Sequence, residues 1–288
     1  MIKNTIFKSE TGKEEIMSFY NSVLKTWPVK YETITIPTRH GNTFIIASGD
    51  KNLQPLILLH GAASNATSWI GDIEKLSQYF RVYSVDIIGD PGKSDPNRPS
   101  YQGLGYAEWL WDVINGLEIK KASIAGISQG GWTALRFATC YPTFVDKLIL
   151  LTPAGIVATN LSFLLKAILL TSFGKAGARR LNRIVFSNQP VHPDALRFMD
   201  LIMEHFKSRI EKEYIFSDQE LKKLDMPVLL IGGKMDVIRS CEKIAARLRK
   251  NILKFETILI PDLGHVLINL SDRMIPFLRM QSNLKIIA

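Results

Sequence analysis

Residues 121–141 read KASIAGISQGGWTALRFATCY, and this stretch decides the fold. Its first seven residues form a short, continuous apolar run, which is typical of a strand buried on both faces of a parallel sheet. Its last ten residues, WTALRFATCY, are compatible with a helix. The turn between them, GISQGG (126–131), is so tight that small residues must flank Ser128, and its hydroxyl is pushed into the open. The stretch therefore predicts a strand–turn–helix unit that presents a reactive serine.

Similar apolar runs recur on both sides of this unit. They read LILLH (56–60), RVYSVD (81–86), KLILLT (147–152), PVLLIGG (227–233) and FETILI (255–260). Helix-compatible segments separate most of them, and such strand–helix alternation indicates an open α/β sheet. Upstream, YETITI (31–36) and TFIIAS (43–48) alternate in polarity around HGN (40–42), which predicts a β-hairpin. We expect a mostly parallel sheet flanked by helices.

The N-terminal region is predicted to be helical. Thr11 followed by Glu14 has the spacing of a capping box, and the apolar residues beyond it fall on one face, so we expect a helix over about 11–26. The first fifteen residues lack the apolar stretch of a signal peptide. A cytoplasmic location is therefore expected.

The stretch between Leu151 and Met226 contains no good strand. A structureless loop of that length is improbable in a compact domain. Helical spacing recurs at 160–171, 178–186 and 194–215. We therefore expect a helical cap, 156–215, inserted into an α/β core that consists of 1–155 and 216–288.

The chain is basic, with a net charge of +9. Such a balance can favour nucleic acid, anionic membranes or anionic substrates. The basic residues are mostly spread out, however, and the densest group has no nucleic-acid-binding motif around it. The most apolar segment, Leu161–Phe173, is too short to span a bilayer and is interrupted by Lys166. We expect no nucleic-acid partner and no membrane span, and the absence of a dinucleotide fingerprint, a P-loop or plausible metal-ligand spacing predicts no cofactor and no metal.

Two further polar residues follow predicted strands near the end of the chain. Asp236 lies in GGKMDVI, just after PVLLIGG, and His265 lies in PDLGHVL, just after FETILI. With Ser128 they match the order nucleophile, acid, histidine, and over nearly all its length the chain resembles the α/β-hydrolase superfamily. The resemblance implies that His265 takes the proton of the serine and returns it to the leaving group. Asp236 would fix the tautomer of His265 and stabilise its cation.

The acid has an alternative in Asp262. That residue lies only three positions before His265 and is poorly placed to reach the far side of its ring, so Asp236 is favoured. When the serine attacks a carbonyl group, negative charge develops on the carbonyl oxygen, and two backbone N–H groups are needed to stabilise it. One belongs by geometry to Gln129, the residue after the nucleophile, and the resemblance assigns the other to Ala62, in the loop after LILLH.

Two loops beside the serine need separate interpretation. His60 belongs to the LILLH loop, and by the same resemblance it orders that loop through backbone hydrogen bonds and takes no part in the chemistry. The family often carries D-x-x-G-x-G-x-S after the next strand, whereas Asp86–Ser94 reads DIIGDPGKS, with one extra residue between the glycines. The insertion puts the local wall of the pocket in doubt and leaves the triad untouched.

The predicted reaction is acyl transfer to water, by a carboxylesterase-like hydrolase acting on a small to medium, fairly apolar ester. Phe163 and Leu164 are expected to line the substrate pocket, because the helix over 161–173 is apolar on more than one side. A C–C bond hydrolase or a perhydrolase uses the same triad, and both stay open because a fold does not fix a substrate. The alternative from another class is a regulatory protein that binds a small ligand with little turnover. The oligomeric state is not predicted.

Overall fold

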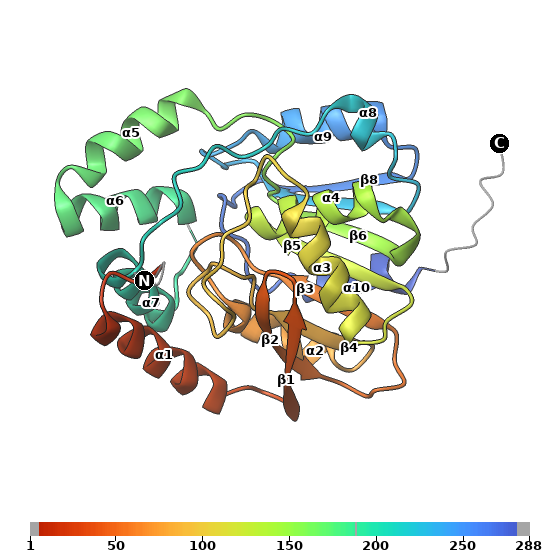
Figure 1. Ribbon diagram of the computed structural model, residues 1–288. Helices are drawn as coiled ribbons and strands as arrows, with labels where there is room; N and C mark the ends of the chain where they lie inside the picture. The colour runs from red at the N-terminus through yellow and green to blue at the C-terminus, as the bar shows by residue number, and fades with distance from the viewer. Residues whose placement is uncertain (1–5, 188, 281–288) are drawn as a thin grey trace.

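The computed structural model describes residues 6–187 and 189–280, which are built around one eight-stranded sheet (Figure 1). The strands lie in the order β1-β2-β4-β3-β5-β6-β7-β8. The β1–β2 and β2–β4 pairs are antiparallel, and all the other neighbours are parallel. The strands are β1 (Tyr31–Thr38), β2 (Gly41–Ser48), β3 (Pro55–Leu59), β4 (Arg81–Val85), β5 (Ala122–Ile127), β6 (Val145–Leu151), β7 (Val228–Gly233) and β8 (Phe255–Ile260). The predicted α/β class with a mostly parallel sheet is confirmed.

The first hairpin turns one residue earlier than the sequence predicts. Thr38 pairs with Gly41, so the loop consists of Arg39 and His40 alone. Two-residue loops suit the twist of a hairpin, and Gly41 takes a φ of +118°, which only glycine adopts readily. Both strands are therefore longer than predicted.

Helices cover both faces of the sheet and bury two separate cores. Successive residues of a strand point to opposite faces, and β3 shows this directly: Leu56 and Leu58 belong to one core, Ile57 and Leu59 to the other. The helices are α1 (Glu10–Lys25), α2 (Ile70–Leu76), α3 (Gly105–Gly116), α4 (Gln129–Cys140), α5 (Leu161–Thr171), α6 (Gly174–Phe186), α7 (Pro193–His205), α8 (Asp218–Leu221), α9 (Cys241–Asn251) and α10 (Ser271–Arg279). None of the helices in the described ranges is long and apolar enough to cross a membrane.

Helices α5, α6 and α7 lie between β6 and β7 in the chain, and together with α1 they occupy one side of the sheet (Figure 1). Helix α1 packs against α7: the rings of Phe19 and Phe198 stack with their centroids 5.7 Å apart, and Ile16 and Ile202 share one small core. On its other face α1 contributes Tyr20 to the core beneath the sheet. The N-terminal helix thus joins the inserted helices to the sheet.

Three details of the predicted helices differ from the structure. Helix α1 spans Glu10–Lys25, as expected, but the side chain of Ser9, and not that of Thr11, accepts the hydrogen bond that caps it. Helix α6 begins at Gly174, four residues before the predicted start. The segment 206–215, predicted as helix, lies outside α7, because Phe206 is extended and forms a β-bridge with Phe7 near the other end of the chain.

Candidate active site

Ser128 occupies the turn between β5 and α4. Its φ of +48° lies in the left-handed region, which is strained for a residue with a side chain. Two hydrogen bonds fix this turn: the Ser128 N–H donates to the Leu151 carbonyl at 2.8 Å, and the Ala154 N–H donates to the Ser128 carbonyl at 3.1 Å. A Cβ at Gly130 would lie 2.3 Å from the Leu59 carbonyl oxygen, which explains why the turn needs glycine there. The backbone therefore holds the serine hydroxyl at the edge of the sheet.

His265 and Asp236 continue from the serine as a chain of hydrogen bonds. His265 Nε2 lies 3.0 Å from Ser128 Oγ, and His265 Nδ1 lies 2.8 Å from Asp236 Oδ2. The other carboxylate oxygen of Asp236 accepts the N–H groups of Ile238 and Arg239. Both His265 and Asp236 are buried. A fully hydrogen-bonded carboxylate of this kind can fix the imidazole so that Nε2 faces the hydroxyl.

The alternative acid, Asp262, lies apart from this chain of hydrogen bonds. Its side chain is exposed. The backbone of His265 is held by two hydrogen bonds: its N–H donates to the Val185 carbonyl of α6 at 3.1 Å, and its carbonyl accepts from Thr152 Oγ1 at 3.0 Å. The inserted helices therefore help to position the histidine.

The loop after β3 brings Ala62 to the same place as Gln129. Gln129 is the first residue of α4 and directly follows the serine, and both Ala62 and Gln129 line one cavity. His60 lies beneath this loop: its Nε2 accepts the Ile87 N–H at 2.9 Å, so Nδ1 carries the proton and donates to the Gly61 carbonyl at 2.8 Å. Burial lowers the pKa of His60 to about 4. A neutral, fully bonded His60 orders the loop, as its interpretation as a structural residue requires.

Asp90 is the residue that sequence reasoning missed. It is buried and lies in the segment after β4 that has the extra residue. It links the loop after β3 to the start of α4: Oδ1 accepts the Ala63 N–H at 3.0 Å, and Oδ2 accepts from Gln129 Nε2 at 3.2 Å. Burial raises the pKa of Asp90 from 3.8 to about 7, although the Ala63 N–H and two nearby arginines, Arg98 and Arg209, act in the opposite direction. The only sequence signal for Asp90 was the irregular glycine spacing of its segment, because Asp90 lies between those two glycines.

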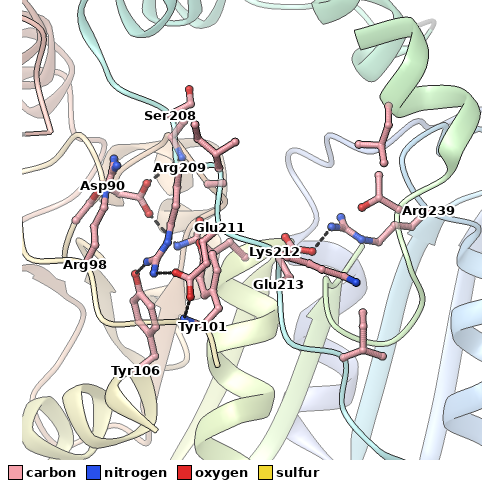
Figure 2. A pocket seen from close by; sticks show the side chains of 18 of the residues that line it. Asp90, Arg98, Tyr101, Tyr106, Ser208, Arg209, Glu211, Lys212, Glu213 and Arg239 are labelled. Carbon is pink, nitrogen blue, oxygen red and sulfur yellow. Dashed lines mark hydrogen bonds and ion pairs between the residues drawn. The ribbon is translucent and has the colours of Figure 1, made fainter. Parts of the chain in front are cut away.

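Figure 2 shows a cavity of about 660 Å³ whose lining includes Gln129, the residue after the serine, while Ser128 and His265 are not among the lining residues. Its wall combines the loops after β3 and β4 with the inserted segment, and Figure 2 shows its charged side chains pointing toward one another. Arg209 pairs with Glu211 and donates to Tyr106 Oη at 2.8 Å, while Arg239 pairs with Glu213. The wall thus contains paired charged side chains that the apolar segment 161–173 does not predict.

The two pocket residues expected from the sequence differ in their positions. Leu164 lines the cavity, whereas Phe163 is not among the lining residues. Arg179, which belongs to the densest basic group of the sequence, does not line the cavity and pairs with Asp200 at 2.7 Å on the exposed surface. The arginines that do line the cavity, Arg98, Arg209 and Arg239, come from segments without a recognisable motif.

The pattern of the alpha/beta hydrolase family matches residues 56–276. The chain belongs to this family. The uncharacterized carboxylesterase nap of Bacillus subtilis is 34% identical to this hydrolase over 256 residues, which cover 86% of this chain and 85% of the relative. The crystal structure of naproxen esterase (carboxylesterase NP) from Bacillus subtilis superposes on the hydrolase with a TM-score of 0.85 at 30% identity, covering 93% of this chain and 98% of that one. The crystal structure of carboxylesterase CesB (YbfK) from the same organism has a TM-score of 0.84 at 28% identity, with coverage of 93% and 99%.

Proposed function

We propose that this hydrolase is a serine carboxylesterase that cleaves a small-molecule ester through an acyl-enzyme. The observation that carries the proposal is the continuous chain of hydrogen bonds from Ser128 Oγ through His265 to Asp236. The next residue after the serine, Gln129, lines the cavity. Its similarity to two carboxylesterases over 86% of the chain supports the same reaction. The fold alone would leave the chemistry open.

The proposed reaction follows from these positions. Ser128 Oγ attacks the ester carbonyl carbon while His265 Nε2 takes the hydroxyl proton, and the Ala62 and Gln129 N–H groups stabilise the resulting oxyanion. His265 then gives the proton to the departing alcohol oxygen, which leaves the acyl group on Ser128. A water molecule repeats the sequence, so that the acid leaves and the hydroxyl is restored. Asp236 stabilises the imidazolium in both steps.

The segment 156–215 serves in this proposal as a cap that selects the substrate. Ala158, Thr159 and Leu164 line one part of the cavity, and residues 208–213 line another. The volume lies within the range of about 300–1,000 Å³ that is usual for small-molecule sites. Because each of two arginines in the wall is paired with a neighbouring glutamate, we infer a small to medium substrate that need not carry a negative charge. A cytoplasmic location stays a prediction from the sequence.

The proposal is tested with a series of p-nitrophenyl esters and a fluorophosphonate probe. Wild-type protein should hydrolyse the esters, and the probe should label Ser128, which mass spectrometry of the peptide can locate. Ser128→Ala should lose a factor of about 10⁶ in kcat, whereas Ser68→Ala, at an exposed serine, should retain the wild-type rate. Labelling at another residue, or an active Ser128→Ala variant, would disprove the proposed nucleophile. Tight ligand binding without hydrolysis would point to a regulatory protein instead.

A further inference from the structure

Helix α5 has no buried residue, although most of its side chains are apolar. We call its exposed apolar side chains, with the one that follows the helix, the α5 face. These side chains are between 43% and 70% exposed and comprise Leu161, Leu164, Leu165, Ile168, Leu169 and Phe173. Figure 1 shows α5 as the outermost helix of the inserted segment, lying above α6. Contiguous apolar patches of this kind are rare on monomeric soluble proteins and mark interaction surfaces.

The charge around the α5 face is of one sign. Residues 148–193 contain no aspartate or glutamate and five basic residues, all of them in the described helices α5 and α6. Two of the five are neutralised, since Lys175 pairs with Glu204 and Arg179 pairs with Asp200. The remaining three, Lys166, Arg180 and Arg183, are exposed and form no ion pair with a described residue. The α5 face is therefore accompanied by uncompensated positive charge.

These two features together indicate the chemistry of the partner. A helix with an apolar face and lysine or arginine beside it lies in the plane of a membrane interface, where anionic headgroups attract the cations. A second copy of this chain is a poor match, because a symmetric dimer brings the same patch of both subunits together. The unpaired cations of α5 and α6 would then repel one another. The partner must therefore offer an apolar interior that accepts the α5 face and a negatively charged surface around it.

We propose that the α5 face docks this hydrolase onto an anionic phospholipid surface. The apolar side chains enter the boundary between headgroups and acyl chains, and Lys166, Arg180 and Arg183 contact the headgroup phosphates. Leu164 belongs both to the α5 face and to the wall of the cavity. Docking therefore brings the rim of the cavity to the lipid surface, and it does not depend on the chemistry at the serine.

Flotation of the purified full-length protein with lipid vesicles tests the proposal. We expect binding to vesicles that contain phosphatidylglycerol and much weaker binding to pure phosphatidylcholine vesicles. Raising the ionic strength from about 0.1 to 1 M should release the protein, because the Debye length falls from about 10 to 3 Å. Equal binding to both kinds of vesicle, or binding to neither, would overturn the proposal.

Two double variants separate the contributions of charge and apolar surface. Each basic residue at an anionic surface contributes a factor of about 5 to the partition coefficient, so Arg180→Gln with Arg183→Gln should lower it by roughly 25-fold. Leu165→Ser with Ile168→Ser should lower it by at least about tenfold, since the replaced side chains no longer favour burial. None of the four residues lines the cavity, so ester hydrolysis in solution should be unchanged.

Matched controls use exposed residues elsewhere on the surface. Leu253 is 97% exposed before β8, and Arg273 is an exposed arginine of α10, so Leu253→Ser and Arg273→Gln should bind vesicles like wild type. Circular dichroism verifies that all variants are folded. Sedimentation equilibrium without vesicles tests the competing occupant. If wild type is a dimer and Leu165→Ser with Ile168→Ser makes it monomeric, a second copy covers the α5 face and the proposal fails.

Discussion

The buried carboxyl of Asp90 predicts an unusual dependence of stability on pH. The folded protein raises the pKa of Asp90 from 3.8 to about 7 through burial. Between these values the folded state keeps a proton that the unfolded chain has released. The free energy of unfolding therefore falls as the pH rises through this window, which is the opposite of the behaviour of a salt-bridged carboxylate. Above about pH 7 the loss is nearly complete.

The size of the effect follows from the two pKa values. A shift of one unit corresponds to about 1.4 kcal/mol, so the full shift amounts to about 4 kcal/mol. Between about pH 5 and pH 8 the linkage relation assigns roughly 2.5 kcal/mol of lost stability to Asp90. Asp90→Asn should remove this loss. It keeps both hydrogen bonds, because Asn Oδ1 can accept the Ala63 N–H and the Gln129 amide can turn to accept from the new NH₂ group.

Urea unfolding at several pH values measures this contribution. The difference in free energy of unfolding between Asp90→Asn and wild type should grow by roughly 2–3 kcal/mol in favour of the variant from about pH 5 to pH 8. Burial also raises the pKa of Asp86, to about 6. Asp86 therefore lowers the free energy of unfolding over the same pH range in both proteins, and its contribution largely cancels in the difference between them. Asp200→Asn is the control: the hydrogen bond from Arg179 lowers the pKa of Asp200, so its titration lies below this window. Parallel curves for wild type and Asp90→Asn would show that Asp90 holds no proton in the folded protein.

Three further predictions concern the site and its wall. Asp236→Asn should lower kcat by about 10⁴, because an amide does not hold the imidazole in the required tautomer; Asp262→Asn, at an exposed position, should change it little, and the reverse ranking would exchange their roles. Gly130→Ala should abolish activity and lower the melting temperature, since its Cβ would lie 2.3 Å from a carbonyl oxygen; wild-type melting and activity would show that the turn can relax. Leu164→Ala should move the preference along a graded series of acyl chain lengths, whereas Phe163→Ala should not, and an equal response would place both side chains on the substrate.

The sequence predicted those features that depend on local constraints. The strand–turn–helix around Ser128 is specified by its own glycines and apolar run. Strands β3 to β8 correspond to short apolar runs in the chain, and β1 and β2 to alternating segments. Ser128, Asp236 and His265 each follow a strand in the chain, and the carboxyl ends of parallel strands meet at one edge of the sheet. The resemblance to the family supplied their roles. Those features needed no knowledge of distant contacts.

The features that the sequence did not reveal depend on distant contacts. Helix α7 stops at His205 because Phe206 pairs with Phe7, some two hundred residues earlier, and no helical periodicity records such a partner. The charged side chains in the cavity wall have the same origin, since Arg239 meets Glu213 only after the chain has folded. Asp90 reads as an ordinary turn residue, and only burial makes it an exceptional carboxyl. Tertiary packing decided each of these cases.

The hydrogen bond from the His265 N–H to the Val185 carbonyl limits how this hydrolase can be re-engineered. Close to it, Ser187 forms a β-bridge with Leu263, and Gln189 Nε2 donates to the Val266 carbonyl at 2.7 Å. Val185, Ser187 and Gln189 thus support the loop that carries the histidine. A chimera that receives the whole insert from a relative keeps the two backbone contacts only where the new segment follows the same path, and it keeps the third only with a glutamine in the place of Gln189. Grafts that stop before Val185 leave all three contacts intact, so new specificities should be easier to recover from the first half of the insert than from complete exchange.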